Sequence, residues 1–163
     1  MKKDYQSFMM EQINKIGIIS GYFSFCHQGH IEYINASKLQ CDKLIVIINN
    51  DKQSKLKGSI QIIDEEHRCF MMNSLKNVDE VKLSIDLDKS VCKTLISIRE
   101  EYPNDKLIFF NSGDRFNINN TNKEELEVCK KYKIKYVAIN LPKIYSSSEL
   151  LKNAFIKYKE LNE

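Results

Sequence analysis

Two histidines three residues apart are the first feature of this chain that could do chemistry. His27 and His30 enclose the segment HQGH, which follows a short apolar run and opens an expected helix. At this spacing two imidazoles lie on the same side of a helix, and Gly29 leaves the backbone between them open to a large anion. The first N–H groups of a helix bind phosphate. Histidines there could donate hydrogen bonds to a phosphate that gains charge in a transition state. For one histidine alone, a helix cap or a satisfied core position is the alternative.

Cationic side chains follow the second expected strand. Lys55 and Lys57 lie in a polar segment, residues 50–59, which we expect to be a mobile loop. Their ammonium groups could reach phosphate oxygens, although a solvated loop charge is the plainer interpretation. Arg68 falls on the helix that comes next. Its guanidinium fork suits bidentate phosphate binding, and a surface ion pair with Asp64 or Glu65 is the alternative.

A serine run opens the last expected helix. Ser146, Ser147 and Ser148 precede Glu149, and the S-x-x-E pattern is a capping box. Capping and phosphate binding are compatible, because hydroxyls and free N–H groups at a helix start can serve both purposes.

The elements that must position these residues alternate between strand and helix. Apolar runs predict strands at 15–20, 43–49, 78–85, 106–111 and 135–140. Helical spacing and caps predict helices at 28–39, 64–75, 88–101, 122–131 and 146–159, with Asp64 capping the second. This order predicts an α/β fold, a Rossmann-like three-layer sandwich with a five-stranded mainly parallel sheet. Ligands of such sheets bind at the carboxyl ends of the strands. We expect residues 1–14 to be an N-terminal extension and 15–163 a single domain.

Composition excludes several classes of protein. The chain has 163 residues, 42% hydrophobic and 29% charged, which is typical of a globular protein rather than a disordered one. Its longest apolar run, Leu44–Ile48, is far shorter than a membrane span, and no secretory signal follows the first methionine. A net charge of +3 does not favour nucleic acid as a partner. Five dispersed cysteines form no CxxC pair, so we expect neither zinc nor disulfides, and a cytoplasmic location.

The motifs resemble those of a known family. The segment GYFSFCHQGHIEYI is similar to the GxFDxxHxGHxxxL signature of the cytidylyltransferase-like nucleotidyltransferases. This group includes glycerol-3-phosphate and choline-phosphate cytidylyltransferases and the adenylyltransferase half of the bifunctional heptose-phosphate enzyme. Further resemblances, in the family's order, are found in Ile48–Val81, Asn111–Arg115 (NSGDR) and Ile144–Ser148 (IYSSS). The resemblance spans about Ile16 to Leu151.

The resemblance implies a reaction and a set of site residues. An oxygen of a small phosphorylated acceptor attacks the α-phosphorus of a nucleoside triphosphate and pyrophosphate leaves, with Mg²⁺ accompanying the triphosphate. The catalytic residues would be His27, His30, Lys57 and Arg68. The nucleotide-binding residues would be Gly21, Tyr22, Phe23, Gly29, Lys55, Asp114, Ser146, Ser147 and Ser148.

Several alternatives remain within and beyond this family. We expect CTP as donor and a polyol, sugar or amino-alcohol phosphate as acceptor, with an adenylyltransferase that uses ATP and a sugar 1-phosphate as the rival. A nucleotide-binding regulatory protein without turnover is a third possibility, because Ser24 stands where the family has aspartate. A nucleophilic role for the thiol of Cys26 is a minor alternative, since the reaction needs no protein nucleophile. Lys143 stands where some relatives have an arginine, so the base preference does not carry over.

The N-terminal segment bears on assembly. Tyr5, Phe8, Met9 and Met10 place four large apolar groups in six residues, and exposing them to water would be costly. We expect them to be buried on the domain or across the interface of a homodimer.

Overall fold

A computed structural model describes residues 13–58, 62–112, 122–142 and 146–162 of the chain. Its strands form a five-stranded sheet in which each paired neighbour is parallel, in the order β3-β2-β1-β4-β5. The strands are β1 (Lys15–Gly21), β2 (Lys43–Ile48), β3 (Glu80–Leu83), β4 (Lys106–Ser112) and β5 (Lys135–Ile139). The helices are α1 (Gln28–Lys38), α2 (Asp51–Lys57), α3 (Glu65–Asn73), α4 (Cys92–Glu101), α5 (Lys123–Lys131) and α6 (Ser147–Glu160). The predicted α/β architecture is confirmed.

The sheet is the middle layer of three. On one face, α4 and α5 pack Leu95, Ile98 and Cys129 against alternate residues of β1, β2 and β4. On the other face, α1 and α3 pack Ile34 and Met72 against the remaining strand residues. The apolar residues of β2 from Leu44 to Ile48 are fully buried, which is why this strand is an unbroken apolar run rather than an alternating one.

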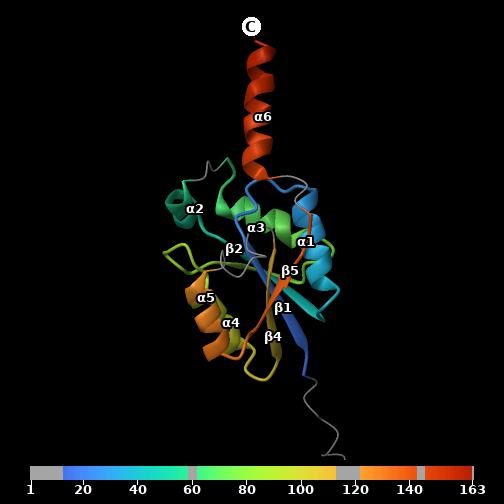
Figure 1. Ribbon diagram of the computed structural model, residues 1–163, viewed down its shortest axis with the longest axis vertical. Helices are drawn as coiled ribbons and strands as arrows, with labels where there is room; N and C mark the ends of the chain where they lie inside the picture. The colour runs from blue at the N-terminus through green and yellow to red at the C-terminus, as the bar shows by residue number, and fades with distance from the viewer. Residues whose placement is uncertain (1–12, 59–61, 113–121, 143–145, 163) are drawn as a thin grey trace, which may run out of the picture.

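Strand order decides where a ligand crevice can form. The chain moves from β1 to β2 and β3 in one direction, then returns to place β4 and β5 on the other side of β1. The switch therefore lies between β1 and β4, at the carboxyl ends that finish in Gly21 and Ser112. In Figure 1 the N-terminal ends of α1, α2 and α6 lie at this same edge.

The segment expected as a mobile loop contains a helix instead. Residues 51–57 form α2, which Asn50 and Gln53 begin with a capping box. The Gln53 side chain is fully buried, and its Nε2 donates to the backbone oxygens of Asp88 and Ser90 at 2.7 and 2.6 Å. The prediction of a mobile loop was wrong because a polar sequence does not reveal that one of its side chains, Gln53, is buried and holds the segment in place.

Two other boundaries differ from the prediction. Strand β3 is shorter than the expected 78–85, and α4 begins at Cys92 rather than near Asp88. The cause is Asp86, whose buried carboxylate accepts hydrogen bonds from the backbone N–H groups of Lys93 and Thr94 at 2.7 and 3.0 Å. The Asp86 side chain therefore provides hydrogen-bond acceptors for backbone N–H groups in the first turn of α4.

The last helix extends away from the rest of the protein. None of the residues of α6 is buried, and Phe155, Tyr158 and Leu161 are 58%, 67% and 84% exposed. Figure 1 shows α6 projecting beyond the carboxyl edge of the sheet. Within the described ranges we find no helix with the length and apolar character of a membrane span. The apolar residues expected to drive assembly, Tyr5, Phe8, Met9 and Met10, lie outside the described residues.

Candidate active site

The two histidines predicted from their spacing lie face to face. His27 is the N-cap residue of α1 and His30 lies in its first turn. Their rings are stacked with centroids 3.9 Å apart, and the ring of Phe23 contacts His30 edge-on at 5.0 Å. The helix spacing therefore brings both imidazoles to the N-terminus of α1, where the helix dipole favours an anion.

Burial keeps these imidazoles neutral at neutral pH. The pKa of His30 is lowered to about 4, mainly by burial and also by neighbouring His27, while a backbone hydrogen bond with Phe25 acts in the opposite direction. Burial also lowers the pKa of His27. Two neutral imidazoles can donate hydrogen bonds to a phosphate oxygen, and each would gain from the charge that develops on that oxygen.

Close contacts account for the glycines on either side of the β1–α1 loop, Gly21 at the end of β1 and Gly29 at the start of α1. A Cβ on Gly21 would lie 2.8 Å from the ring of Phe23, and a Cβ on Gly29 would lie 3.2 Å from the ring of His27. Phe23 itself is buried and has a φ of 49°, a conformation that costs free energy for a bulky residue. The loop therefore accepts backbone strain to place the Phe23 ring beneath His30.

The predicted lysines lie in the last turn of α2. Lys55 and Lys57 are exposed, and the Nζ atom of Lys57 lies 4.3 Å from the centroid of the Tyr22 ring. Tyr22 follows β1 directly, so this contact joins α2 to the loop that carries the histidines. The contact with Tyr22 brings Lys57 to the histidine loop.

Arg68 is engaged within the protein, whereas the resemblance implied a phosphate ligand. The side chain is completely buried, and Nη1 donates to the backbone oxygens of Tyr22 and Asn49 at 2.6 and 2.8 Å. Nη2 lies 2.7 Å from Oδ1 of Asp51. The ion pair suggested with Asp64 or Glu65 is therefore made with Asp51 instead. This guanidinium links the ends of β1 and β2 to the start of α2.

The serine run caps α6 beside the histidine loop. The Ser146 side chain accepts a hydrogen bond from the backbone N–H of Glu149, which confirms the predicted cap. The Ser147 hydroxyl donates to the backbone oxygen of Phe25 at 3.3 Å. This bond brings the N-terminus of α6, with Ser148 in its first turn, next to the N-terminus of α1. Two helix N-termini therefore meet at the carboxyl edge of the sheet, an arrangement suited to a polyphosphate.

Comparison with known proteins agrees with this geometry. The family model described as cytidylyltransferase-like matches residues 18–154. The chain belongs to the cytidylyltransferase-like family. The resemblance drawn from the four motifs is thereby confirmed.

Individual relatives of the chain match over part of their length. An FAD synthase from Picrophilus torridus is 39% identical over 82 residues, which are 50% of this chain and 58% of that protein. The bifunctional protein HldE from Granulibacter bethesdensis is 36% identical over 87 residues, which are 52% of this chain and 18% of that protein. The chain thus spans little more than half the length of the FAD synthase it matches.

Solved structures share the fold. A lipopolysaccharide core biosynthesis protein from Thermoplasma volcanium superposes with a TM-score of 0.60 at 26% identity, covering 77% of this chain and 96% of that one. A nicotinic acid mononucleotide adenylyltransferase from Plasmodium falciparum, solved with NaAD, has a TM-score of 0.53 at 19% identity, with coverages of 83% and 81%. The second likeness concerns the fold alone.

The residues that organise this cytidylyltransferase-like site include several that the sequence reasoning missed. At the start of α2, Asn50 and Gln53 donate to backbone oxygens of the segment between β3 and α4, and Asp51 pairs with Arg68. The N-x-x-Q spacing at the start of α2 was the signal that could have revealed them. Ser24, which replaces the family aspartate, is buried in the β1–α1 loop. Asp114 and Lys143 lie outside the described residues.

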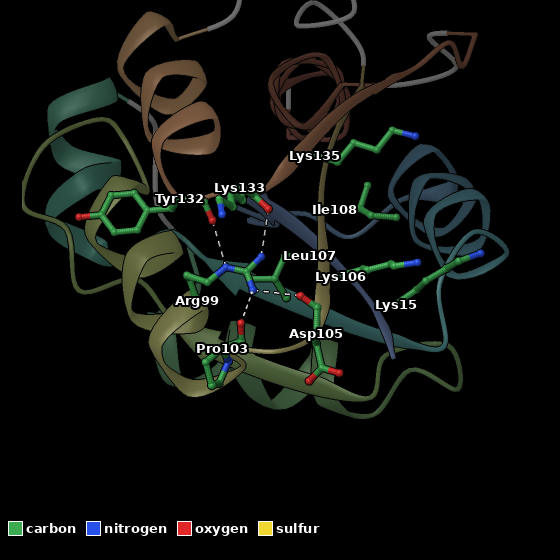
Figure 2. A pocket seen from close by; sticks show the side chains of 10 residues that line it. All are labelled: Lys15, Arg99, Pro103, Asp105, Lys106, Leu107, Ile108, Tyr132, Lys133 and Lys135. Atoms are coloured by element: carbon green, nitrogen blue, oxygen red, sulfur yellow. Dashed lines mark hydrogen bonds between the residues drawn. The ribbon is translucent and has the colours of Figure 1, made fainter. Parts of the chain in front are cut away.

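A separate cavity lies at the opposite edge of the sheet. Its volume is about 480 Å³. The residues that line it include Lys15, Lys106 and Lys135, which begin β1, β4 and β5. Figure 2 shows that the guanidinium of Arg99 in its wall is directed at backbone oxygens. The histidines and the serine run do not line this cavity.

Proposed function

We propose that this chain is a nucleotidyltransferase that transfers AMP from ATP to a small phosphorylated acceptor. An acceptor phosphate oxygen attacks the α-phosphorus, a new P–O bond forms, and the bond to the departing pyrophosphate breaks. The observation that carries the proposal is the stacked pair His27 and His30 at the N-terminus of α1, beside the switch point of the sheet. Such a displacement requires positioning and neutralisation of charge rather than a protein nucleophile.

Each site group has a role in this reaction. Neutral His27 and His30 would donate hydrogen bonds to the α-phosphate as its charge grows. Lys57 would neutralise the β- and γ-phosphates from α2, and the N-terminus of α6 with Ser146 and Ser148 would bind the same oxygens. Gly21, Phe23 and Gly29 would shape the loop around the nucleotide, and we keep Lys55 and Asp114 as proposed nucleotide contacts.

Mg²⁺ would enter with the triphosphate as part of the substrate. Among the residues that the structure describes, no group of three histidine, cysteine, aspartate or glutamate side chains gathers as a metal site. Phosphate oxygens and water would therefore supply most of the ligands of the ion.

The donor nucleotide is proposed from the names of relatives. The sequence alone favoured CTP, with ATP as the rival. The FAD synthases that match the chain are named for a product that contains an adenine nucleotide, and they are 33% to 39% identical over the matched region. We therefore propose ATP as the donor and keep CTP transfer to a polyol phosphate as the alternative to be tested.

Pyrophosphate release distinguishes these donors. Purified protein with Mg²⁺ is incubated with ATP or CTP and, separately, with FMN, a sugar 1-phosphate, glycerol 3-phosphate or phosphocholine. We expect pyrophosphate and a dinucleotide-type product with ATP and one acceptor, identified by mass spectrometry. Release only with CTP would replace the proposed donor, and failure to bind either triphosphate would refute the proposed function.

A second candidate is a nucleotide-binding regulatory protein without turnover. The observation that favours it is Ser24, buried where the family has an aspartate. Tight binding of ATP with no pyrophosphate release for any acceptor would support this candidate. Turnover restored by Ser24→Asp would then identify the serine as the cause.

We also propose that the chain forms a homodimer. Phe155 and Tyr158 on α6, and Leu161 directly after it, expose apolar surface that a second copy could cover. Sedimentation equilibrium of the full chain at tens of micromolar tests the proposal. A monomer under these conditions would refute it.

A further inference from the structure

Tyr22 lies between a buried arginine and an exposed lysine. Its backbone oxygen accepts the 2.6 Å hydrogen bond from Nη1 of Arg68, and its ring lies 4.3 Å from Nζ of Lys57. The three residues come from α3, the end of β1 and the end of α2, so only the folded chain brings them together.

Arg68 determines where the backbone of Tyr22 can be. The guanidinium is completely buried and donates to Tyr22 and Asn49, the residues at the ends of neighbouring strands, while it pairs with Asp51. Three short bonds from one rigid planar group allow little relative movement of these segments. Because the backbone of Tyr22 is held in place, the Cα atom from which its side chain extends is held in place as well.

The other end of the contact is anchored independently. Helix α2, which carries Lys57, is held by the fully buried side chain of Gln53 and by the capping box with Asn50. The Tyr22 hydroxyl also lies 3.5 Å from the backbone oxygen of Gln53. Tyr22 therefore contacts α2 both at Gln53 and at Lys57, the last residue of the helix, whose ammonium group lies over the ring.

An aromatic ring is a suitable holder for a lysine that must bind phosphate. A carboxylate in its place would neutralise the ammonium group and compete with the substrate for its N–H donors. A ring face attracts the cation by about 0.5–1 kcal/mol at an exposed site and leaves its charge in place. The contact with the ring thus restricts the position of the Lys57 ammonium group and does not remove its positive charge.

We propose that Tyr22 is a positioning residue that holds the ammonium group of Lys57 at the crevice for the triphosphate, and that Arg68 acts through Tyr22. The inference rests on the proposed function, in which Lys57 contacts the β- and γ-phosphates. Tyr22 was expected from the family resemblance to contact the nucleotide, and this proposal gives it a different task.

A double-mutant cycle tests the coupling. Tyr22→Leu, Lys57→Met and the double variant are compared for kcat and for the KM of the triphosphate. Losing the lysine removes a charge-assisted hydrogen bond and is expected to raise KM about 10-fold. Tyr22→Leu is expected to raise KM about 2- to 5-fold. The double variant should match Lys57→Met, because without the lysine the ring has nothing to position.

Matched variants separate positioning from folding. Tyr22→Phe keeps the ring and should stay within about twofold of the wild type in KM. Lys52→Met removes another exposed lysine of α2 and should leave KM unchanged. Arg68→Lys should raise KM with no further increase when Tyr22→Leu is added. If that variant does not fold, the cycle between Tyr22 and Lys57 still decides the inference.

The outcomes separate this inference from the proposed function. A wild-type protein that neither turns over nor binds inorganic tripolyphosphate would refute the proposed function, and the inference with it. A wild-type protein that turns over, with effects of Tyr22→Leu and Lys57→Met that multiply in the double variant, would refute the inference alone. A Tyr22→Phe variant as impaired as Tyr22→Leu would also overturn it, since the ring would not be the part that matters.

Discussion

One arginine holds the loops together at each edge of the sheet. At the carboxyl edge, Arg68 is completely buried, donates to two backbone oxygens and pairs with Asp51. At the amino edge, half-buried Arg99 donates to five backbone oxygens, those of Tyr102, Pro103, Asp105, Tyr132 and Lys133. Burial lowers the pKa of Arg99, and Asp105 opposes that shift.

The difference between the edges lies in what the arginine positions. Around Arg99 the bonded oxygens belong to turns that connect α4 to β4 and α5 to β5. Around Arg68 they belong to the segments that carry Tyr22 and α2, next to the histidine loop. The same side chain therefore stabilises the fold at one edge and, as we propose, also orders the site at the other.

Replacing each arginine by methionine gives the largest expected effect. Arg68→Met should lower the free energy of unfolding by about 3 kcal/mol, because buried oxygens and Asp51 lose their partner. Turnover per folded molecule should fall as well. Arg99→Met should cost about 2 kcal/mol and leave turnover per folded molecule unchanged. Urea unfolding and pyrophosphate release measure the two quantities, and equal losses of turnover would contradict the comparison.

Replacing His30 tests whether the reaction takes place at the carboxyl edge of the sheet. His30→Ala should lower kcat about 100-fold or more, since it removes a donor to the growing phosphate charge. The control is His67→Ala, because His67 is an exposed α3 residue that pairs with Asp64. That variant should keep the wild-type kcat. Near-normal turnover of His30→Ala would move the chemistry away from the histidine pair.

The partly buried His30 also makes the free energy of unfolding depend on pH. The pKa of His30 is about 4 in the folded chain and near 6.5 when unfolded, so the unfolded state binds more protons between these values. The contribution of His30 to the free energy of unfolding is fully present above pH 6.5 and is lost as the pH falls toward 4. Allowing for partial exposure, we expect a loss of about 2 kcal/mol.

Urea unfolding at pH 7.5 and pH 4.5 measures this dependence. The His30→Gln variant cannot titrate at this position and should lose about 2 kcal/mol less than the wild type over that range. An identical pH dependence in both proteins would show that His30 is not the group responsible.

The smallest expected effect comes from the cap of the helix that carries Arg68. The Asp64 side chain accepts a hydrogen bond from the backbone N–H of His67 at 2.9 Å. Asp64→Ala should cost about 1 kcal/mol of stability. Asn122→Ala at the start of α5 removes a similar cap from a helix that carries no proposed site residue, and should cost about the same. Only the first variant is expected to raise the KM of the triphosphate, by less than twofold.

The sequence by itself determined the fold class and the position of the histidine site. Buried parallel strands need unbroken apolar runs, and the βαβ connections then bring the strand ends to one edge. The i, i+3 spacing brings His27 and His30 to the same side of α1 once the helix begins at this point of the chain. The caps Asp64 and Ser146 were also predictable, because a cap is a local interaction between a side chain and the next few N–H groups.

Only the tertiary structure determined where Arg68 and Lys57 lie and which groups they contact. Nothing local in the sequence distinguishes Arg68 from a surface arginine, because its partners Tyr22, Asn49 and Asp51 are 46, 19 and 17 positions away. The helix that carries Lys57 exists because Gln53 reaches oxygens 35 and 37 residues later in the chain. Long-range contacts of this kind depend on the complete packing of the sheet, and they determine which charged side chain is buried and which one stays exposed.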